Sequence, residues 1–206
     1  MELRSSQAPA RAQTTRTAIV ETAERLFRAH GYQKTAVADI ARELRMSPAN
    51  VYRFFASKAA INEAICARTL HEIDALAWSI ARGPGSAADR LRQLFRTIQQ
   101  QTMTLFFDDK RLHDMVAAAM DEHWGVIKSH IESIDKALRH IVMDGIAAGD
   151  FAAADPDRTG FLLHRTMIVF CHPTLVQQCI DDDLPAMAGQ MAEFVLRALR
   201  KSNDES

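Results

Sequence analysis

Several features that would assign the protein to other classes are missing from its 206 residues. No apolar run reaches the roughly 18 residues that a membrane-spanning helix needs, and residues 1–15 hold no apolar segment of the kind found in a secretory signal peptide. Only three cysteines are present, an odd number without paired spacing, so a disulfide framework is not expected. These absences predict a cytoplasmic protein with no membrane partner.

Glycine and proline are scarce as well, and most of them fall between segments of helical periodicity. The alternation of apolar and polar residues that is typical of strands is absent. No nucleophile–base signature, phosphate loop or nucleotide fingerprint appears. The sequence therefore predicts an all-α protein of about nine helices that is not an enzyme and needs no cofactor.

Apolar residues at helical spacing, with caps and breakers at the ends, delimit these helices. Residues 1–14 are polar and predict a mobile arm, and Thr35, Ser47 and Ser57 stand where N-caps are expected. The expected helices cover approximately residues 15–30, 36–44, 48–54, 58–82, 87–105, 111–120, 127–148, 156–171 and 184–200.

The net charge of −1 hides an uneven distribution along the chain. Residues 1–60 hold ten Lys and Arg residues against five Asp and Glu residues, a net charge of +5. The remaining residues hold 15 basic and 21 acidic side chains, a net charge of −6. This division predicts a basic head, residues 1–60, and an acidic body.

Two short expected helices in the basic head are separated only by residues 45–47, and a longer helix precedes them. These are the dimensions of a helix-turn-helix unit. Small residues at the start of the second short helix would let its backbone approach a DNA groove, where Asn50 can bridge an adenine edge and Arg53 can take a guanine or a phosphate. We also expect Arg4, Arg11 and Arg16 to add phosphate or minor-groove contacts.

Residues 18–58 closely resemble the DNA-binding domain of the TetR family of bacterial repressors, in the stretches AERLFRAHGY, ADIARELRMS and VYRFFASK. The resemblance implies a homodimer whose third helices enter successive major grooves of a palindromic operator, about 34–36 Å apart. By the same resemblance, Thr35, Tyr52 and Lys58 are phosphate-contacting positions, and Ser47, Ala49, Asn50 and Arg53 form the reading surface.

Arg45 departs from the family pattern, which usually has glycine, or sometimes asparagine, at this position. The second helix must end there with a positive φ, which costs a residue other than glycine roughly 1 kcal/mol. Either the turn relaxes or Arg45 is tolerated for its charge beside DNA. We predict a positive φ at Arg45 and include this residue in the DNA-binding site.

For the acidic body the resemblance implies architecture more than chemistry. The last two long helices, about 156–171 and 184–200, are expected to pair with their copies in a four-helix dimer interface. An apolar stripe on the final helix suits this role, although it could instead pack inside its own subunit. The stripe consists of Met187, Met191, Phe194, Val195 and Ala198.

The other helices of the body would enclose a cavity for a small effector, lined by aromatic and Met residues that form adaptable apolar pockets. Each of these side chains could instead belong to the plain core. The candidates are Trp78, Phe95, Met103, Phe106, Phe107, Met115, Met120, Trp124, Phe161 and His164. Nearby acids would favour a cationic lipophilic ligand, namely Asp108, Asp114, Asp121 and Glu122.

Two other groupings are weaker candidates. A metal site could be drawn from His113, Asp114, Asp121 and His123, but these residues lack the i, i+4 spacing that directs two ligands the same way. A redox switch could be drawn from Cys171 and Cys179 with His164 and His172, but nothing nearby would favour a thiolate. Neither a metal nor a redox role is therefore expected.

Together these features predict a ligand-responsive transcriptional repressor that a small, lipophilic effector releases from its operator. Residues 1–14 would be a flexible basic arm, 15–60 the DNA-binding domain, and 61–206 a helical bundle that binds the effector and dimerises. An activator, or a regulator without an effector, is the alternative within DNA binding. An all-helical enzyme or a lipid-binding protein is the rival from another class.

Overall fold

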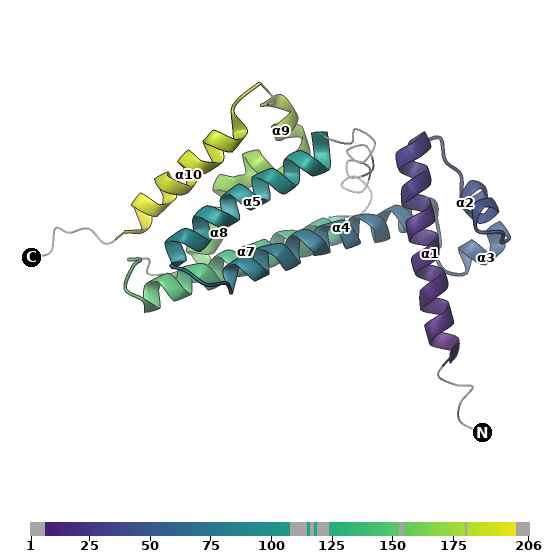
Figure 1. Ribbon diagram of the computed structural model, residues 1–206, viewed down its shortest axis with the longest axis horizontal. Helices are drawn as coiled ribbons and strands as arrows, with labels where there is room; N and C mark the ends of the chain where they lie inside the picture. The colour runs from purple at the N-terminus through teal and green to yellow at the C-terminus, as the bar shows by residue number, and fades with distance from the viewer. Residues whose placement is uncertain are drawn as a thin grey trace, which may run out of the picture. The chain divides into compact units, whose positions relative to one another are not determined.

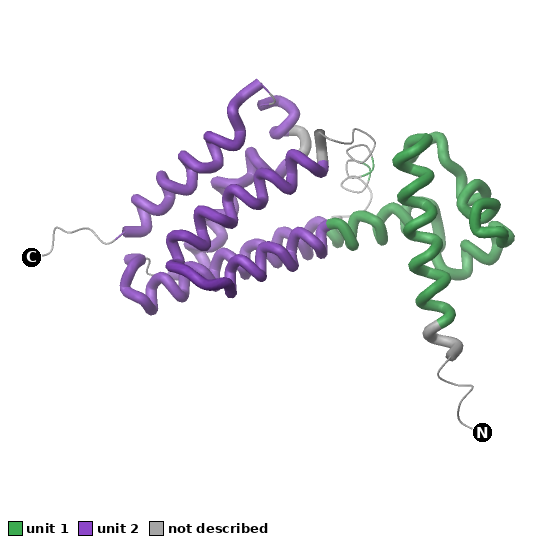
Figure 2. The backbone as a smooth tube through the Cα atoms, in the orientation of Figure 1, with its two compact units in different colours: residues 1–69, 109–126 green, residues 70–108, 127–206 purple. Residues whose placement is uncertain are grey.

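The chain divides into two compact units in the computed structural model, which describes residues 7–107, 115, 118, 124–152, 155–179 and 181–200. Unit 1 holds residues 1–69 and 109–126, and unit 2 holds residues 70–108 and 127–206 (Figure 2). The described residues form helices joined by short turns, with one isolated bridge between Phe151 and Arg200. Within these residues no helix has an apolar stretch long enough to cross a bilayer.

Unit 1 is built on a long first helix, with two short helices together on one side of it (Figure 1). A fourth helix starts in unit 1 and continues into unit 2, so the expected boundary between residues 60 and 61 falls inside a continuous helix. The helices are α1 (Gln7–His30), α2 (Val37–Glu43), α3 (Pro48–Tyr52) and α4 (Lys58–Ala81).

Helix α1 begins at Gln7, eight residues before the expected start at Thr15. The polar composition of residues 7–14 led to the expectation of an arm, but this stretch is helical. Its Ala, Gln and Arg residues favour helix, and Pro9 lies in the first turn, where its missing N–H costs nothing. The continuation also avoids the cost of nucleation because the helix is already formed further along.

The core of unit 1 joins all four helices. Ile19 and Phe27 of α1, Ile40 of α2 and Val51 of α3 are fully buried, as the helical periodicity predicts. In the connection after α3, Phe55 also lies in the core, whereas Phe54 is half-buried. This packing fixes the outer face of α3.

The N-cap of α2 is Ala36, not the expected Thr35. The Asp39 carboxylate accepts the Ala36 N–H at 2.9 Å, and this hydrogen bond, followed by that from Arg42, lowers the pKa of Asp39. Thr35 lies one residue too early to cap and points inward. It is 3% exposed, and its hydroxyl donates to the Gly31 carbonyl at 3.0 Å.

Unit 2 contains the second half of α4 and five more helices. Their bounds agree with the expected helices to within a few residues, and Pro173 starts a further short helix directly after the helix that ends at Cys171. The helices are α5 (Ala87–Phe107), α7 (Trp124–Ala147), α8 (Pro156–Cys171), α9 (Pro173–Gln178) and α10 (Leu184–Leu199). The helix expected at 111–120 lies outside the described residues, apart from residues 115 and 118.

Helix α8 packs against α5, α9 and α10, and α10 also packs on α5 (Figure 1). Helices α7 and α8 approach closely at Gly160, where an added Cβ would lie 2.9 Å from the Arg139 backbone nitrogen. Phe161 and Arg165 of α8 are both exposed. The buried face holds Gly160, Leu163, His164, Met167 and Phe170.

Candidate nucleic-acid interface

The turn between α2 and α3 has the predicted left-handed residue, since Arg45 has a φ of 53°. The Arg45 N–H donates to the Arg42 carbonyl at 3.1 Å, and the Met46 N–H donates to the Ala41 carbonyl at 2.9 Å. These two bonds are those of a Schellman motif, with Arg45 at the position that glycine usually occupies. The expected positive φ is therefore confirmed, and this motif sets the direction in which α3 leaves the turn.

Helix α3 starts as expected, with Ser47 as its N-cap and Pro48 in the first turn. The Ser47 hydroxyl oxygen accepts the Asn50 N–H at 3.2 Å. Because the oxygen acts as an acceptor in this bond, the hydroxyl proton can still be donated to an outside acceptor such as a phosphate oxygen.

Burial of Val51 turns the other side chains of α3 outward. Ala49 and Arg53 are exposed, and Tyr52 is 51% exposed, a high value for so large a side chain. Asn50 is half-buried, and among the described residues its amide donates only to the Met46 thioether sulfur, at 3.7 Å. Sulfur is a weak acceptor, so the amide loses little when it turns to a base edge.

Lys58, the first residue of α4, is held in position from across the unit. Its ammonium donates to the Tyr32 carbonyl at 2.9 Å and lies 4.4 Å from the centre of the Tyr32 ring. The Tyr32 ring in turn packs edge-on against Phe27, 5.2 Å away. An ammonium has three donors, so Lys58 keeps N–H groups for a phosphate while its side chain is already ordered.

Most of the acidic side chains of the basic head are neutralised within unit 1. Asp39, Glu43 and Glu24 are all paired with arginines, and Glu24 pairs with both Arg28 and Arg68. Among the described residues, six cations of the head have no carboxylate within ion-pair distance. They are Arg11, Arg16, Lys34, Arg45, Arg53 and Lys58. The unpaired positive charge thus includes the α2–α3 turn and both ends of the α3–α4 connection.

The expected effector-lining residues are not gathered around one cavity by the described contacts. Trp78 donates through Nε1 to Ser133 Oγ at 3.2 Å, and His164 is buried with its Nδ1 2.6 Å from Asp135 Oδ1. Phe95 is fully buried in unit 2, Met103 is half-buried, Phe161 is exposed and Met115 is buried in unit 1. For Phe106, Phe107 and Trp124 only the backbone is described, and Met120 lies outside the described residues.

The acids expected near the effector also lie outside the described residues, and so do the four residues of the metal hypothesis. For the redox hypothesis, burial raises the pKa of the Cys171 thiol to about 12. A thiol with this pKa stays protonated at neutral pH and is a poor nucleophile.

Several contacts around the site have no signal in the sequence. Arg16 of α1 stacks on the Phe55 ring, with its guanidinium carbon 4.3 Å from the ring centre. Tyr32 holds Lys58 from 26 residues away. In unit 2, His130 Nδ1 of α7 lies 2.7 Å from Asp74 Oδ1 of α4. These partners are too far apart in sequence for periodicity or capping rules to connect them.

Comparison with known proteins identifies two families that match separate parts of the chain. Residues 19–65 match the family described as bacterial regulatory proteins, tetR family. Residues 87–191 match the family described as tetracyclin repressor-like, C-terminal domain. A comparison with curated sequences gave no match.

Solved structures share the fold. A TetR-family regulator from Pectobacterium atrosepticum is 19% identical, with a TM-score of 0.72 over 94% of this chain and 97% of the other. SmeT, the repressor of a multidrug efflux pump of Stenotrophomonas maltophilia, is 17% identical, with a TM-score of 0.64 over 93% of each chain. FadR, a fatty acid degradation regulator from Bacillus halodurans, is 17% identical, with a TM-score of 0.64 over 88% of this chain and 94% of FadR.

An all-helical chain with an N-terminal helix-turn-helix unit and a helical C-terminal domain defines a DNA-binding transcriptional regulator. The chain belongs to the TetR family, since the C-terminal family match alone spans half of its length. The resemblance of residues 18–58 and the all-α fold expected from the sequence are thus confirmed. Dimerisation and response to a ligand are typical of this family.

Proposed function

We propose that the protein is a repressor that binds a palindromic operator as a homodimer and is released by a small lipophilic effector. The observation that carries the DNA-binding part is the outer face of α3, which is exposed and adjoins cations that have no carboxylate partner among the described residues. The repressor role is supported by the fold shared with SmeT, which represses an efflux pump. SmeT has also been solved in complex with triclosan, a small molecule.

In this proposal the unit around α3 reads DNA and the remainder of the chain dimerises and binds the effector. Asn50 takes a base edge, and Arg53 takes a guanine or a phosphate. Tyr52 and Lys58 donate to phosphates, and Arg45 adds positive charge at the turn. Ser47 and Ala49 complete the reading surface. Thr35 is left out because its hydroxyl proton is used within unit 1.

The dimer is proposed to form through α8 and α10. Three of the five large apolar side chains most exposed in the described chain lie on these two helices. Phe194 is 63% exposed, Leu162 48% and Phe161 36%. The expected α10 stripe divides, since Val195 is buried within its own subunit whereas Phe194 is not. Exposed aromatic and aliphatic side chains gathered on neighbouring helices indicate a protein interface.

Effector release is proposed to act through α4, the helix that both units share. The effector must bind the form that does not hold DNA more tightly, and a coupling of about 1–3 kcal/mol is typical of such regulators. Aromatic and Met side chains of the body would suit an apolar ligand. We propose that residues of unit 2 contribute to its site, namely Trp78, Met103, Phe106, Phe107 and His164.

The DNA-binding proposal is tested with duplexes selected from a randomised pool by the full-length protein. Lys58→Ala should weaken binding to all duplexes and reduce the slope of log K against log salt by about 0.9. Asn50→Ala should relax the preference at particular base pairs and leave the slope unchanged. If both variants bind the selected site like the wild type, the assignment of α3 is wrong.

The dimer is tested by sedimentation of Phe194→Asp at micromolar concentration. We expect dimers for the wild type and monomers for this variant, because a charge in an apolar interface leaves that charge unpaired. Met143→Asp on α7 is the matched control, since Met143 is also exposed, at 42%, but lies outside the proposed interface. A dimeric Phe194→Asp protein would contradict the assignment.

Repression and release are tested by transcription in vitro from a promoter that carries the selected site. The wild type should lower transcript yield, and a lipophilic cation such as tetraphenylphosphonium should restore it. Decanoate, a lipophilic anion, is the control for the charge of the effector. Increased transcription on adding the protein alone would show an activator and refute the repressor role.

A further inference from the structure

Helix α5 carries a buried polar side chain that the packing of unit 2 leaves without a partner. Gln99 is 5% exposed, and its Nε2 atom is enclosed and donates to no acceptor among the described residues. An unpaired donor at this depth lowers stability, and most buried polar groups of proteins are therefore hydrogen-bonded. Because an apolar side chain would fill the same place without this cost, core packing does not explain why a glutamine lies here.

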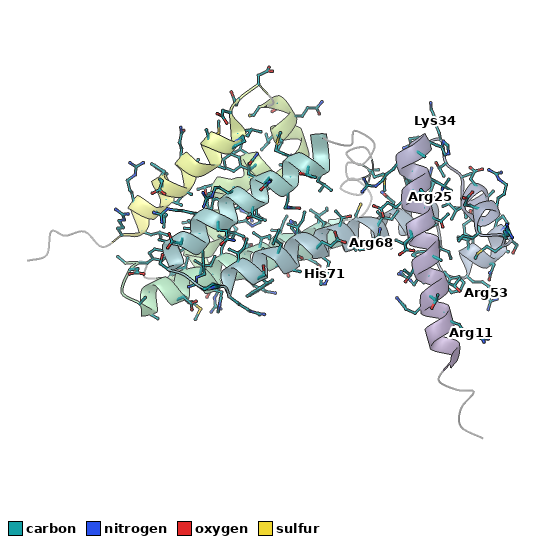
Figure 3. All side chains as sticks on the ribbon, in the orientation of Figure 1. Arg11, Arg25, Lys34, Arg53, Arg68 and His71 are labelled. Atoms are coloured by element: carbon teal, nitrogen blue, oxygen red, sulfur yellow. The ribbon has the colours of Figure 1, made fainter. Side chains whose placement is uncertain are left out.

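Gln99 belongs to a row of α5 residues that faces the interior of unit 2. Four residues follow one another at steps of four, three and four positions, which places them on one face of the helix. They are Phe95, Gln99, Thr102 and Phe106. The first three are buried, and α8 and α10 pack against α5 in this unit (Figure 3). Since Phe106 is one of the residues proposed for the effector site, Gln99 lies on the face of α5 that is proposed to meet the effector.

Helix α8 contributes a buried acceptor. His164 is 4% exposed, and its hydrogen bond within the described residues joins Nδ1 to Asp135 Oδ1 at 2.6 Å. Burial lowers the pKa of His164, although Asp135 acts to raise it, so the ring is neutral at pH 7. A carboxylate only accepts hydrogen bonds, so the one ring proton is on Nδ1 and Nε2 keeps its lone pair. The two ring nitrogens point in different directions, so this lone pair is directed away from Asp135.

We propose that Gln99 and His164 bind a hydroxyl group of an effector that is otherwise apolar. This inference rests on the proposed effector site in unit 2 and names the chemical class of its ligand. A hydroxyl oxygen accepts from Gln99 Nε2 while its proton is donated to His164 Nε2, so one hydroxyl satisfies both buried groups. An ammonium has no lone pair for Gln99, and a carboxylate would bring a second negative charge close to Asp135. A few polar groups among apolar side chains are the usual construction of a ligand site.

The expected size follows from the net strength of a hydrogen bond. One neutral hydrogen bond that replaces a bond to water changes an affinity by about fivefold. A compound with a hydroxyl should therefore bind the wild type about 25-fold more tightly than the compound with a methyl group in its place. A methyl ether accepts from Gln99 but donates nothing to His164, so its affinity should lie between the two.

The experiment crosses protein variants with matched compounds, whose dissociation constants are measured on the full-length protein through the fluorescence of the compounds. para-Phenylphenol, para-methoxybiphenyl and para-methylbiphenyl differ only in the group that would meet Gln99 and His164. β-Naphthol, β-methoxynaphthalene and β-methylnaphthalene repeat the series on a second scaffold. Gln99→Met keeps the length of the side chain and removes its donor. Gln100→Met is the matched control, because Gln100 is the same residue type one position along and is exposed.

We expect the preference for the phenol over the methyl compound to fall from about 25-fold in the wild type and Gln100→Met to about fivefold in Gln99→Met. In Gln99→Met the methyl ether should bind no more tightly than the methyl compound. The ether tests His164 without a substitution, so Asp135 keeps its partner. Without a ligand, Gln99→Met should melt at or above the wild type, since it removes an unpaired buried donor.

The outcomes separate this inference from the proposed function. If no compound of either scaffold binds the wild type, the proposed effector site fails, and the inference with it. If the compounds bind but the hydroxyl gives no preference, or if Gln99→Met keeps the full preference, the inference alone is overturned. A Gln99→Met protein that melts well below the wild type or does not fold would show that a structural water pairs Gln99 within the fold, which also overturns the inference.

Discussion

Replacing Arg45 by glycine should stabilise the protein although it removes an arginine. The φ of 53° at Arg45 costs a residue with a Cβ about 1–2 kcal/mol, and glycine avoids this cost. Glycine loses roughly 0.5–1 kcal/mol more conformational entropy on folding. The difference is a net gain of about 0.5–1 kcal/mol, which for a chain of this size corresponds to a rise of about 1–4 °C in the melting temperature.

Arg53→Gly is the matched control. Arg53 has a right-handed φ of −69° and is also an exposed arginine of unit 1, so the same replacement changes charge and entropy alike but relieves no strain. We expect this variant to melt below the wild type. Thermal denaturation of all three proteins at one protomer concentration is the assay, because the stability of a dimer depends on concentration. If Arg45→Gly melts at or below the wild type, the strain argument is refuted.

Binding should change in the opposite direction to stability in Arg45→Gly. If the guanidinium lies beside DNA, its loss should reduce operator affinity and lower the salt slope by up to about 0.9. A variant that is more stable but binds more weakly would show that the arginine is retained at this position for its charge. Unchanged affinity in Arg45→Gly would show that Arg45 does not contact the duplex.

Three further predictions concern packing and protonation. Gly160→Ala should lower the free energy of unfolding by about 1–3 kcal/mol, because its Cβ would lie 2.9 Å from the Arg139 backbone nitrogen. Gly189→Ala should instead raise the melting temperature, because its Cβ would meet nothing within 4 Å. Thr35→Val should lower the free energy of unfolding by about 1–3 kcal/mol, since the Thr35 hydroxyl donates to backbone carbonyls within unit 1. Its operator affinity should stay unchanged. Weaker DNA binding at unchanged stability would instead indicate the phosphate contact expected from the sequence. Burial lowers the pKa of His164, so the unfolded chain takes up its proton first and stability should fall as the pH drops below about 6.5. Melting curves between pH 7.5 and 5.5 should therefore shift less for His164→Gln than for the wild type.

Local patterns predicted a large part of the fold. Asp155 and Asp183 cap α8 and α10, and both helices start within one residue of the expected positions. Ser47 caps α3 as expected, and Arg45 has the positive φ that the turn requires. Caps and turns involve residues only three to five positions apart, so the residue types themselves determine them.

The candidate site was predicted less completely. Phe54 and Phe55 are adjacent and of the same residue type, and only the folded unit distinguishes them by burying Phe55 in the core. Thr35 is a residue type favoured at N-caps, but it lies one residue before Ala36, the N-cap of α2. The early start of α1 was missed because a polar stretch gives no periodic signal, even where its residues favour helix.

The sequence by itself determined the all-helical class, the family and the division of charge, because each of these depends on residue type and local order. Only the tertiary structure decided which side chains remain free to meet a partner. Lys58 is ordered by Tyr32, Arg16 is held on Phe55, and Thr35 turns inward. The first two outcomes depend on packing between residues 26 and 39 positions apart, and the third on burial within the unit. Many arrangements compete there, and no local rule selects among them.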